Sequence, residues 1–151
     1  MRIIKGMAVL GALGAALVFG AATPSGAITD HWVFNAGMNG SREVPGPGDT
    51  GASGHARITV DVETGEICWE LTVRNVEETV IAAHIHVGAR DVAGPIVQAL
   101  TPPTTGESSG CATNADVADA IVADPSGYYV NVHSTLFPGG AVRGQLAGPH
   151  N

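Results

Sequence analysis

The chain has 151 residues, of which 44% are hydrophobic, 14% charged and 5% aromatic, and it contains 21 glycines and 9 prolines. This length predicts one domain, and so few charges argue against a coiled coil and against disorder caused by charge excess. Seven basic and fourteen acidic side chains give a net charge of -7. Such a surface repels phosphates, so nucleic acid is not expected as a partner.

The first segment has the pattern of a secretory signal peptide. Arg2 and Lys5 precede an apolar run over 7–22, and Ser25-Gly26-Ala27 offers small residues for cleavage. The run is too short and too rich in glycine for a membrane span. We therefore expect 1–27 to be removed and 28–151 to form a single secreted or periplasmic domain, with no membrane span after cleavage. With five arginines, no lysine and fourteen carboxylates, that domain has a net charge of -9.

Both cysteines, Cys68 and Cys111, lie in the exported part. An even number of cysteines in an exported domain predicts a disulfide, which would close a loop of roughly forty residues. Two thiolate metal ligands are the alternative, but they would need a spacing of the CxxC type that the chain lacks.

Alternation of apolar and polar residues dominates the exported part and predicts short strands with one buried face. The core faces are expected to include Val62 and Ile81, while 45–54 and 101–110 have the composition of loops. One short helix is expected, with Thr113 to Asp116 as a capping box and Asp124-Pro125 as its stop. The seven expected strands are 31–35, 57–62, 67–73, 80–87, 96–100, 128–134 and 141–146. This pattern predicts an all-β fold, an antiparallel Greek-key-like sandwich or flattened barrel with one short helix.

The sharpest chemical motif is His84-Ile85-His86. In a strand, residues two apart point to the same side with Cα atoms about 6.5 Å apart, and Ala83 and Ile85 are better suited to the core. By the same alternation His133 lies on the polar face of 128–134. If the two strands are neighbours, the three imidazoles converge on one patch that suits copper or zinc and leaves a coordination position open.

The alternative for these histidines is that they lie on exposed strand faces and bind no metal. His55 is a possible fourth ligand, whereas His31 and His150 are expected to be solvated near the chain ends. The two histidine strands belong to a weak internal repeat, because His86 and His133 are each followed by a Gly/Pro-containing turn and an apolar strand.

Two other polar residues need an interpretation. Arg143 lies between apolar strand residues and requires carboxylate or carbonyl partners, so it is expected to be a structural clamp, or alternatively a guide for a small anion. Asp49-Thr50-Gly51 matches a motif of aspartic proteases, but it follows a loop instead of a hydrophobic strand. We expect Asp49 to form a turn and to be solvated.

Several segments in order along the chain closely resemble the CHRD domain. They are Gly65 to Trp69, Ala83 to Gly88, Gly94-Pro95, Gly127 to His133 and Phe137 to Leu146. The resemblance covers 31–146 and implies a secreted domain of bacterial type, with no particular activity attached to it.

A more distant similarity is to copper-zinc superoxide dismutases, antiparallel sandwiches with a His-x-His strand and a later lone histidine among the copper ligands. By that similarity His84 and His86 match the pair and His133 the later ligand. No histidine lies between Gly88 and Thr113, so the similarity implies no dinuclear site.

The sequence thus favours an exported, non-catalytic binding module for an extracytoplasmic ligand or protein that the sequence does not identify. His84, His86 and His133 form its candidate mononuclear copper or zinc site, and no catalytic residue is assigned. The alternatives are a mononuclear copper enzyme acting on superoxide and a purely structural or adhesive domain without metal.

Overall fold

The computed structural model describes residues 31–149. The expected signal peptide and His150 lie outside this range. Eight strands, one α-helix and two short 3-10 helices make up the described part. They are β1 (His31–Asn39), η1 (Gly40–Arg42), β2 (Ser53–Asp61), β3 (Glu66–Arg74), β4 (Val80–Val87), β5 (Ile96–Leu100), β6 (Glu107–Thr113), α1 (Ala115–Ala123), η2 (Pro125–Gly127), β7 (Tyr128–Ser134) and β8 (Val142–Gln145).

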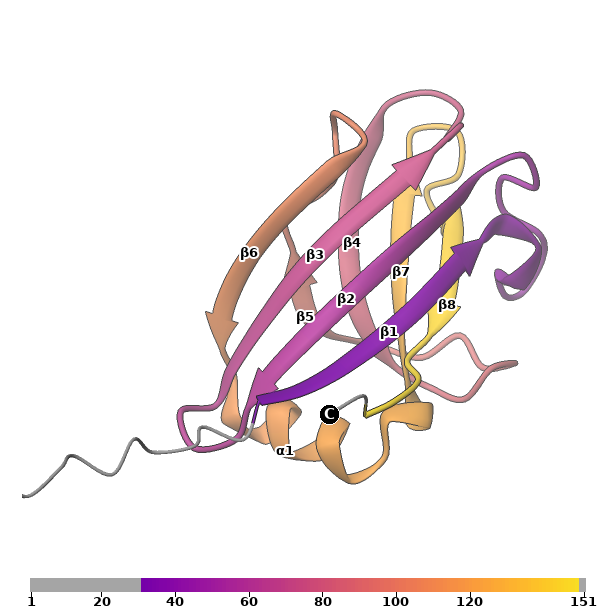
Figure 1. Cartoon of the computed structure of the whole chain (residues 1–151). Coiled ribbons are helices and arrows are strands. Elements are labelled where there is room, and N and C mark those ends of the chain that lie inside the picture. Colours follow the sequence, from indigo (N-terminus) through magenta and orange to yellow (C-terminus); the bar gives the residue numbers. More distant parts are fainter. Residues whose placement is uncertain (1–30, 150–151) are drawn as a thin grey trace, which may run out of the picture.

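The strands form one sheet in the order β5-β4-β7-β8-β1-β2-β3-β6, and every strand pairing is antiparallel. Figure 1 shows how this sheet curls, so that β6, β3, β2 and β1 face β5, β4, β7 and β8. Three neighbouring pairs, β4–β7, β8–β1 and β3–β6, join strands that are not consecutive in the chain. The expected all-β, antiparallel flattened barrel with one short helix is confirmed.

The core fills the space inside the curled sheet. Alternation places Ile58 and Val60 of β2, Ile67 and Leu71 of β3, and Ile85 of β4 on its inner face, all almost completely buried. Each such side chain contributes about 1.5–3 kcal/mol when fully removed from water. Helix α1 lies at one end of the barrel (Figure 1), where its buried residues Ala118 and Ile121 belong to the same core.

One strand was missed by the sequence prediction. The segment 101–110, expected to be a loop, contains the first four residues of β6, which pairs with β3. Serines and a glycine hide the strand pattern there. Gly110 lies opposite Trp69, and a Cβ on Gly110 would come within 2.6 Å of the indole ring. The missing side chain therefore makes room for the tryptophan.

Three local predictions are wrong. Ile81 is 48% exposed because the β4–β7 register shifts between Val80 and Ala82, so that Val80 is buried instead. Val62, expected in the core, is 38% exposed just beyond the end of β2. The helix begins after Asn114, whose side chain makes no capping hydrogen bond, so the expected capping box is not formed; the Asn114 amide bonds Val97 and Gln98 instead.

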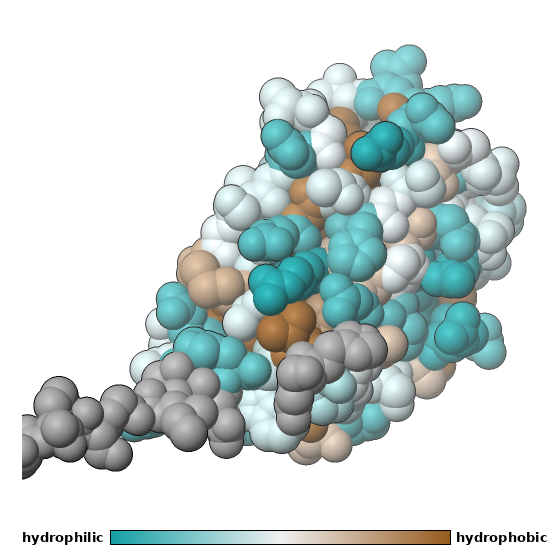
Figure 2. Space-filling view, viewed as in Figure 1, coloured by the Kyte–Doolittle hydropathy of each residue, from teal (hydrophilic) through white to brown (hydrophobic). Residues whose placement is uncertain are grey.

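The expected disulfide is confirmed between Cys68 and Cys111, which face each other across β3 and β6. It fastens the sheet's last strand, which has a neighbour on one side only. No helix among the described residues is long and apolar enough to span a membrane. Hydrophilic side chains cover much of the face seen in Figure 2, with apolar patches between them.

Candidate metal centre

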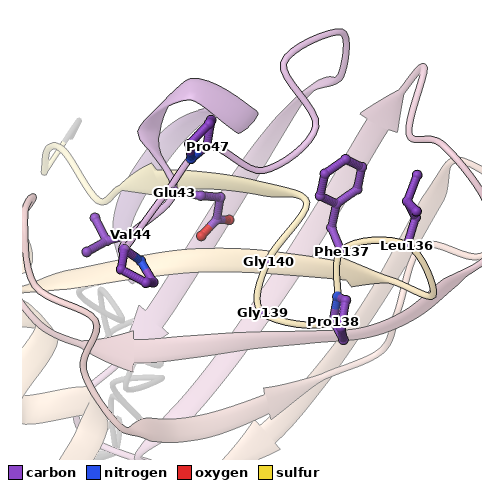
Figure 3. A pocket seen from close by; sticks show the side chains of 10 residues that line it. Glu43, Val44, Pro47, Leu136, Phe137, Pro138, Gly139 and Gly140 are labelled. Carbon is purple, nitrogen blue, oxygen red and sulfur yellow. The ribbon is translucent and has the colours of Figure 1, made fainter.

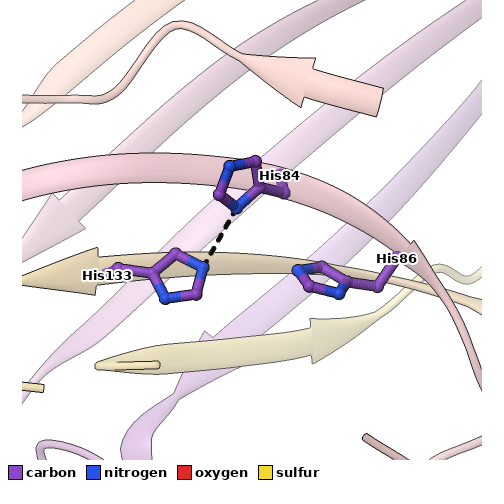
Figure 4. Close-up of side chains that lie close together, drawn as sticks. All are labelled: His84, His86 and His133. Atoms are coloured by element: carbon purple, nitrogen blue, oxygen red, sulfur yellow. Dashed lines mark hydrogen bonds between the residues drawn. The ribbon is translucent and has the colours of Figure 1, made fainter. Parts of the chain in front are cut away.

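Pairing of β4 with β7 brings the three candidate histidines together. Across this pair His133 lies opposite Ala82, and His84 lies opposite Asn131. Their imidazoles converge from the two strands on the face opposite the core (Figure 4), and one ligand atom from each lies within 4.8 Å of the others. The closest pair is His84 Nδ1 and His133 Nε2, at 3.1 Å.

This polar face is not a solvated surface. His86 and His133 are only 8% and 9% exposed, and His84 is half-buried. Asn131 and Tyr129, which lie on the same face, are also buried. The strand pattern correctly separates the core side from the polar side, but the interpretation of the polar side as exposed is wrong for these residues.

Hydrogen bonds to backbone carbonyls fix two of the imidazoles. Nδ1 of His86 donates to the Gly94 carbonyl at 2.9 Å, and Nδ1 of His133 donates to the Pro138 carbonyl at 3.0 Å. A carbonyl oxygen only accepts, so Nδ1 carries the proton and Nε2 presents a lone pair. Nε2 of His86 is buried and has no hydrogen-bond partner within the described residues.

The weak internal repeat of the sequence has a structural counterpart in the hydrogen bonds of His86 and His133 to backbone carbonyls. The turn between β4 and β5 orients the histidine at the end of β4, and the turn between β7 and β8 orients the histidine at the end of β7. Each hairpin thus holds its own imidazole with a carbonyl from its own turn.

Burial lowers the pKa of all three histidines, since it penalises the charged imidazolium. For His84 the pKa falls to about 4, because burial is reinforced by repulsion from His133 and His86. The cluster is therefore neutral at neutral pH, which is the protonation state that a metal ion requires.

Arg143 packs on one face of the Tyr129 ring, and Tyr129 in turn stacks on His86 of the histidine cluster. Its guanidinium carbon is 3.4 Å from the centre of the Tyr129 ring, and that ring stacks on His86 with centroids 4.7 Å apart. The guanidinium donates to the carbonyls of Ala89 at 2.7 Å and Val92 at 2.9 Å, and the residue is 2% exposed. These contacts are those of a clamp on the β4–β5 turn.

Sequence reasoning missed Glu43 and Asn131. Asn131 Nδ2 donates to Glu43 Oε1 at 2.8 Å, and the two residues are 2% and 9% exposed. Burial raises the pKa of Glu43 to about 7, although the positive charge of Arg143 and the Asn131 hydrogen bond oppose this. Alternation places Asn131 on the polar face, but no pattern in the Gly/Pro-rich segment around Glu43 indicates its burial.

The remaining candidates lie elsewhere. His55 is exposed on β2 and is not part of the cluster, and His31 is exposed at the start of β1. Glu66 lies near Cys68 and Cys111, but both sulfurs are in the disulfide. Asp49 forms a turn as expected, accepting from the Gly51 amide, but it is buried instead of solvated, and its other oxygen accepts from the Glu77 amide.

The fold and the cluster define a class of protein: a small antiparallel β-barrel domain with three histidines on one buried polar face. A family model described as "CHRD domain" matches residues 34–146, and the chain therefore belongs to the CHRD domain family. No curated protein and no solved structure matches the chain significantly. Family membership supports a role as a binding module.

Proposed function

We propose that this CHRD domain is an exported, non-catalytic binding module that holds one copper or zinc ion between His84, His86 and His133. The observation that carries the proposal is the buried Nε2 of His86, which lacks a hydrogen-bond partner among the described residues and belongs to a cluster of three convergent ligand atoms. A buried acceptor without a partner costs about 1–3 kcal/mol, and a metal ion would relieve that cost.

The chemistry of the donor set fits copper or zinc. Neutral imidazole nitrogens suit both ions, and hard cations such as Mg²⁺ or Ca²⁺ prefer oxygen ligands. Backbone carbonyls already hold the His86 and His133 rings in the tautomer that offers Nε2. When bound, such an ion supplies a Lewis acid with room for one further ligand.

Without a metal, the same geometry allows one hydrogen bond inside the cluster. His84 Nδ1 would donate its proton to His133 Nε2 across 3.1 Å. This arrangement leaves His86 Nε2 without a partner, whereas a metal ion would engage all three imidazoles.

The test is metal analysis of untagged protein from the exported fraction. We expect about one copper or zinc ion per chain, lost in His84→Ala, His86→Ala and His133→Ala. His55→Ala is the matched control, because it removes an exposed histidine outside the cluster. Absence of binding at micromolar free copper and zinc, or unchanged binding in all three cluster variants, would overturn the proposal.

Export is a separate part of the proposal, supported by the Arg2 to Ala27 segment and by the disulfide. The intact mass of the protein from the exported fraction checks it. A mass equal to that of a chain beginning near Ile28 supports cleavage. A full-length protein retained in the cytoplasm refutes export.

A superoxide-consumption assay on the copper-loaded protein separates binder from enzyme. Because His86 and His133 are less than 10% exposed, we expect no activity above that of the buffer. Catalytic consumption that disappears in His133→Ala would instead establish the copper enzyme.

A further inference from the structure

A pocket of about 280 Å³ lies beside the histidine cluster, and the cluster does not use it. It is formed by two loops far apart in the sequence, the segment after η1 and the turn between β7 and β8 (Figure 3). We call it the Glu43 pocket. Its principal lining residues are Glu43, Val44, Pro45, Pro47, Leu136 and Phe137.

The walls of the Glu43 pocket are apolar, and Glu43 is the one residue with a charged side chain among those that line it. Figure 3 shows Phe137 and Leu136 on one side and the proline-containing segment on the other, with the Glu43 carboxyl between them. A small apolar volume with one carboxyl is the form of a site that orients a small ligand through a single polar contact.

Glu43 retains capacity for a further hydrogen bond. Its Oε1 accepts from Asn131 Nδ2 and the carboxyl also accepts from the Val44 backbone, but a carboxylate has about four lone-pair sites. Within residues 31–149 no basic side chain forms an ion pair with it. Burial raises its pKa to about 7 even though the positive charge of Arg143 lowers it, so a further positive charge beside the carboxylate would be favourable.

We propose that the Glu43 pocket binds a small organic cation, a primary ammonium carried on a compact aliphatic or aromatic body. The ammonium donates to Glu43 and places a second positive charge beside the carboxylate. The body packs against the prolines and Leu136, and the face of Phe137 offers a favourable surface to a cation. The volume of about 280 Å³ limits the ligand to the size of a single ring or a short chain.

The experiment compares benzylammonium with benzyl alcohol, which has a similar shape and no charge. Binding to the full protein is followed at pH 8 by chemical-shift changes, and in a second series by calorimetry. We expect benzylammonium to bind at least roughly tenfold more tightly, with shifts centred on 43–47 and 136–140, because a charge-assisted hydrogen bond to a buried carboxylate is strong. Equal affinities, or shifts elsewhere on the protein, would overturn the proposal.

Two variants locate the site. Glu43→Gln is expected to abolish the preference for the ammonium while retaining the shape of the pocket. Leu136→Ala removes part of one wall from a side chain that is 52% exposed and so tolerates truncation, and it should weaken both ligands severalfold. Ile81→Ala is the matched control, since Ile81 is 48% exposed and does not line the pocket. Ammonium binding unchanged in both pocket variants refutes the assignment even if the histidines bind metal, and the proposed metal site does not depend on it.

Discussion

Burial acts in opposite directions on the two kinds of titratable group on the polar face. It raises the pKa of Glu43 to about 7 and lowers that of His84 to about 4, because in each case the uncharged form is the better one in a medium of low dielectric constant. At a pH above 4 and well below 7, Glu43 and His84 are therefore both uncharged, whereas Arg143 keeps its positive charge. Its guanidinium is satisfied by two carbonyls and the Tyr129 ring.

Glu43 makes the stability of the protein depend on pH. Between pH 4.5 and 7 the folded protein keeps a proton on Glu43 that the unfolded chain has lost, so the contribution of Glu43 to the free energy of unfolding decreases as the pH rises through this range. This contribution is on the order of 3 kcal/mol, and the lowered pKa values of the three histidines act in the opposite direction. Glu43→Gln should remove the Glu43 contribution from the pH profile and be more stable than the original at pH 8. Chemical denaturation at pH 5 and pH 8 measures both effects, and parallel pH profiles for the two proteins would contradict the prediction.

Arg143→Lys should destabilise the fold. A lysine cannot donate to the Ala89 and Val92 carbonyls in the forked geometry of a guanidinium, so one of these contacts is lost, at a cost of roughly 1–3 kcal/mol. Arg57→Lys is the control, because Arg57 forms an exposed pair with Glu70 and an exposed hydrogen bond to Thr59, and exposed pairs contribute about 0–1 kcal/mol. Equal melting temperatures for the two variants would show that Arg143 is not a clamp.

At the scale of elements, alternation was sufficient to find seven strands and to separate the core face from the histidine face. It could not show that β4 pairs with β7, because strand order depends on contacts between distant segments, and the convergence of His84 and His133 follows from that pairing. The shift between Val80 and Ala82 explains the misplacement of Ile81. Strand β6 lacks the apolar period, and its pairing partner β3 defines it instead.

The β4–β5 turn supports a prediction about this element. A Cβ on Gly94 would collide with the Val87 carbonyl, so Gly94→Ala must displace the turn whose carbonyl orients His86. We expect a loss of roughly 1–3 kcal/mol of stability and weaker copper or zinc binding than in the original protein. Thermal melting and metal titration measure the two effects.

Gly37→Ala is the control for Gly94→Ala, because nothing lies within 4 Å of a Cβ at Gly37. It should retain both stability and metal affinity. Full stability of Gly94→Ala would show that the turn accommodates a side chain without moving.

For the whole molecule, the Cys68–Cys111 disulfide restrains the unfolded chain. The two cysteines are 43 residues apart, and closing a loop of that size stabilises the folded state by about 4 kcal/mol on the chain-entropy account. Reduction should therefore lower the melting temperature, and the double variant Cys68→Ser/Cys111→Ser should melt at the same lower temperature in the presence or absence of reductant. Two free thiols in the native, unreduced protein would contradict the prediction.

The carbonyls of Gly94 and Pro138 have one more consequence. Since they hold the His86 and His133 rings in place from within the folded barrel, two of the three proposed ligands are oriented without an ion. A chelator should then remove the bound ion from the proposed site and leave the native barrel folded. A zinc finger, by contrast, unfolds without its metal. Such a domain would bind and release an ion repeatedly without unfolding, because the free energy of metal binding would not be needed to fold the chain.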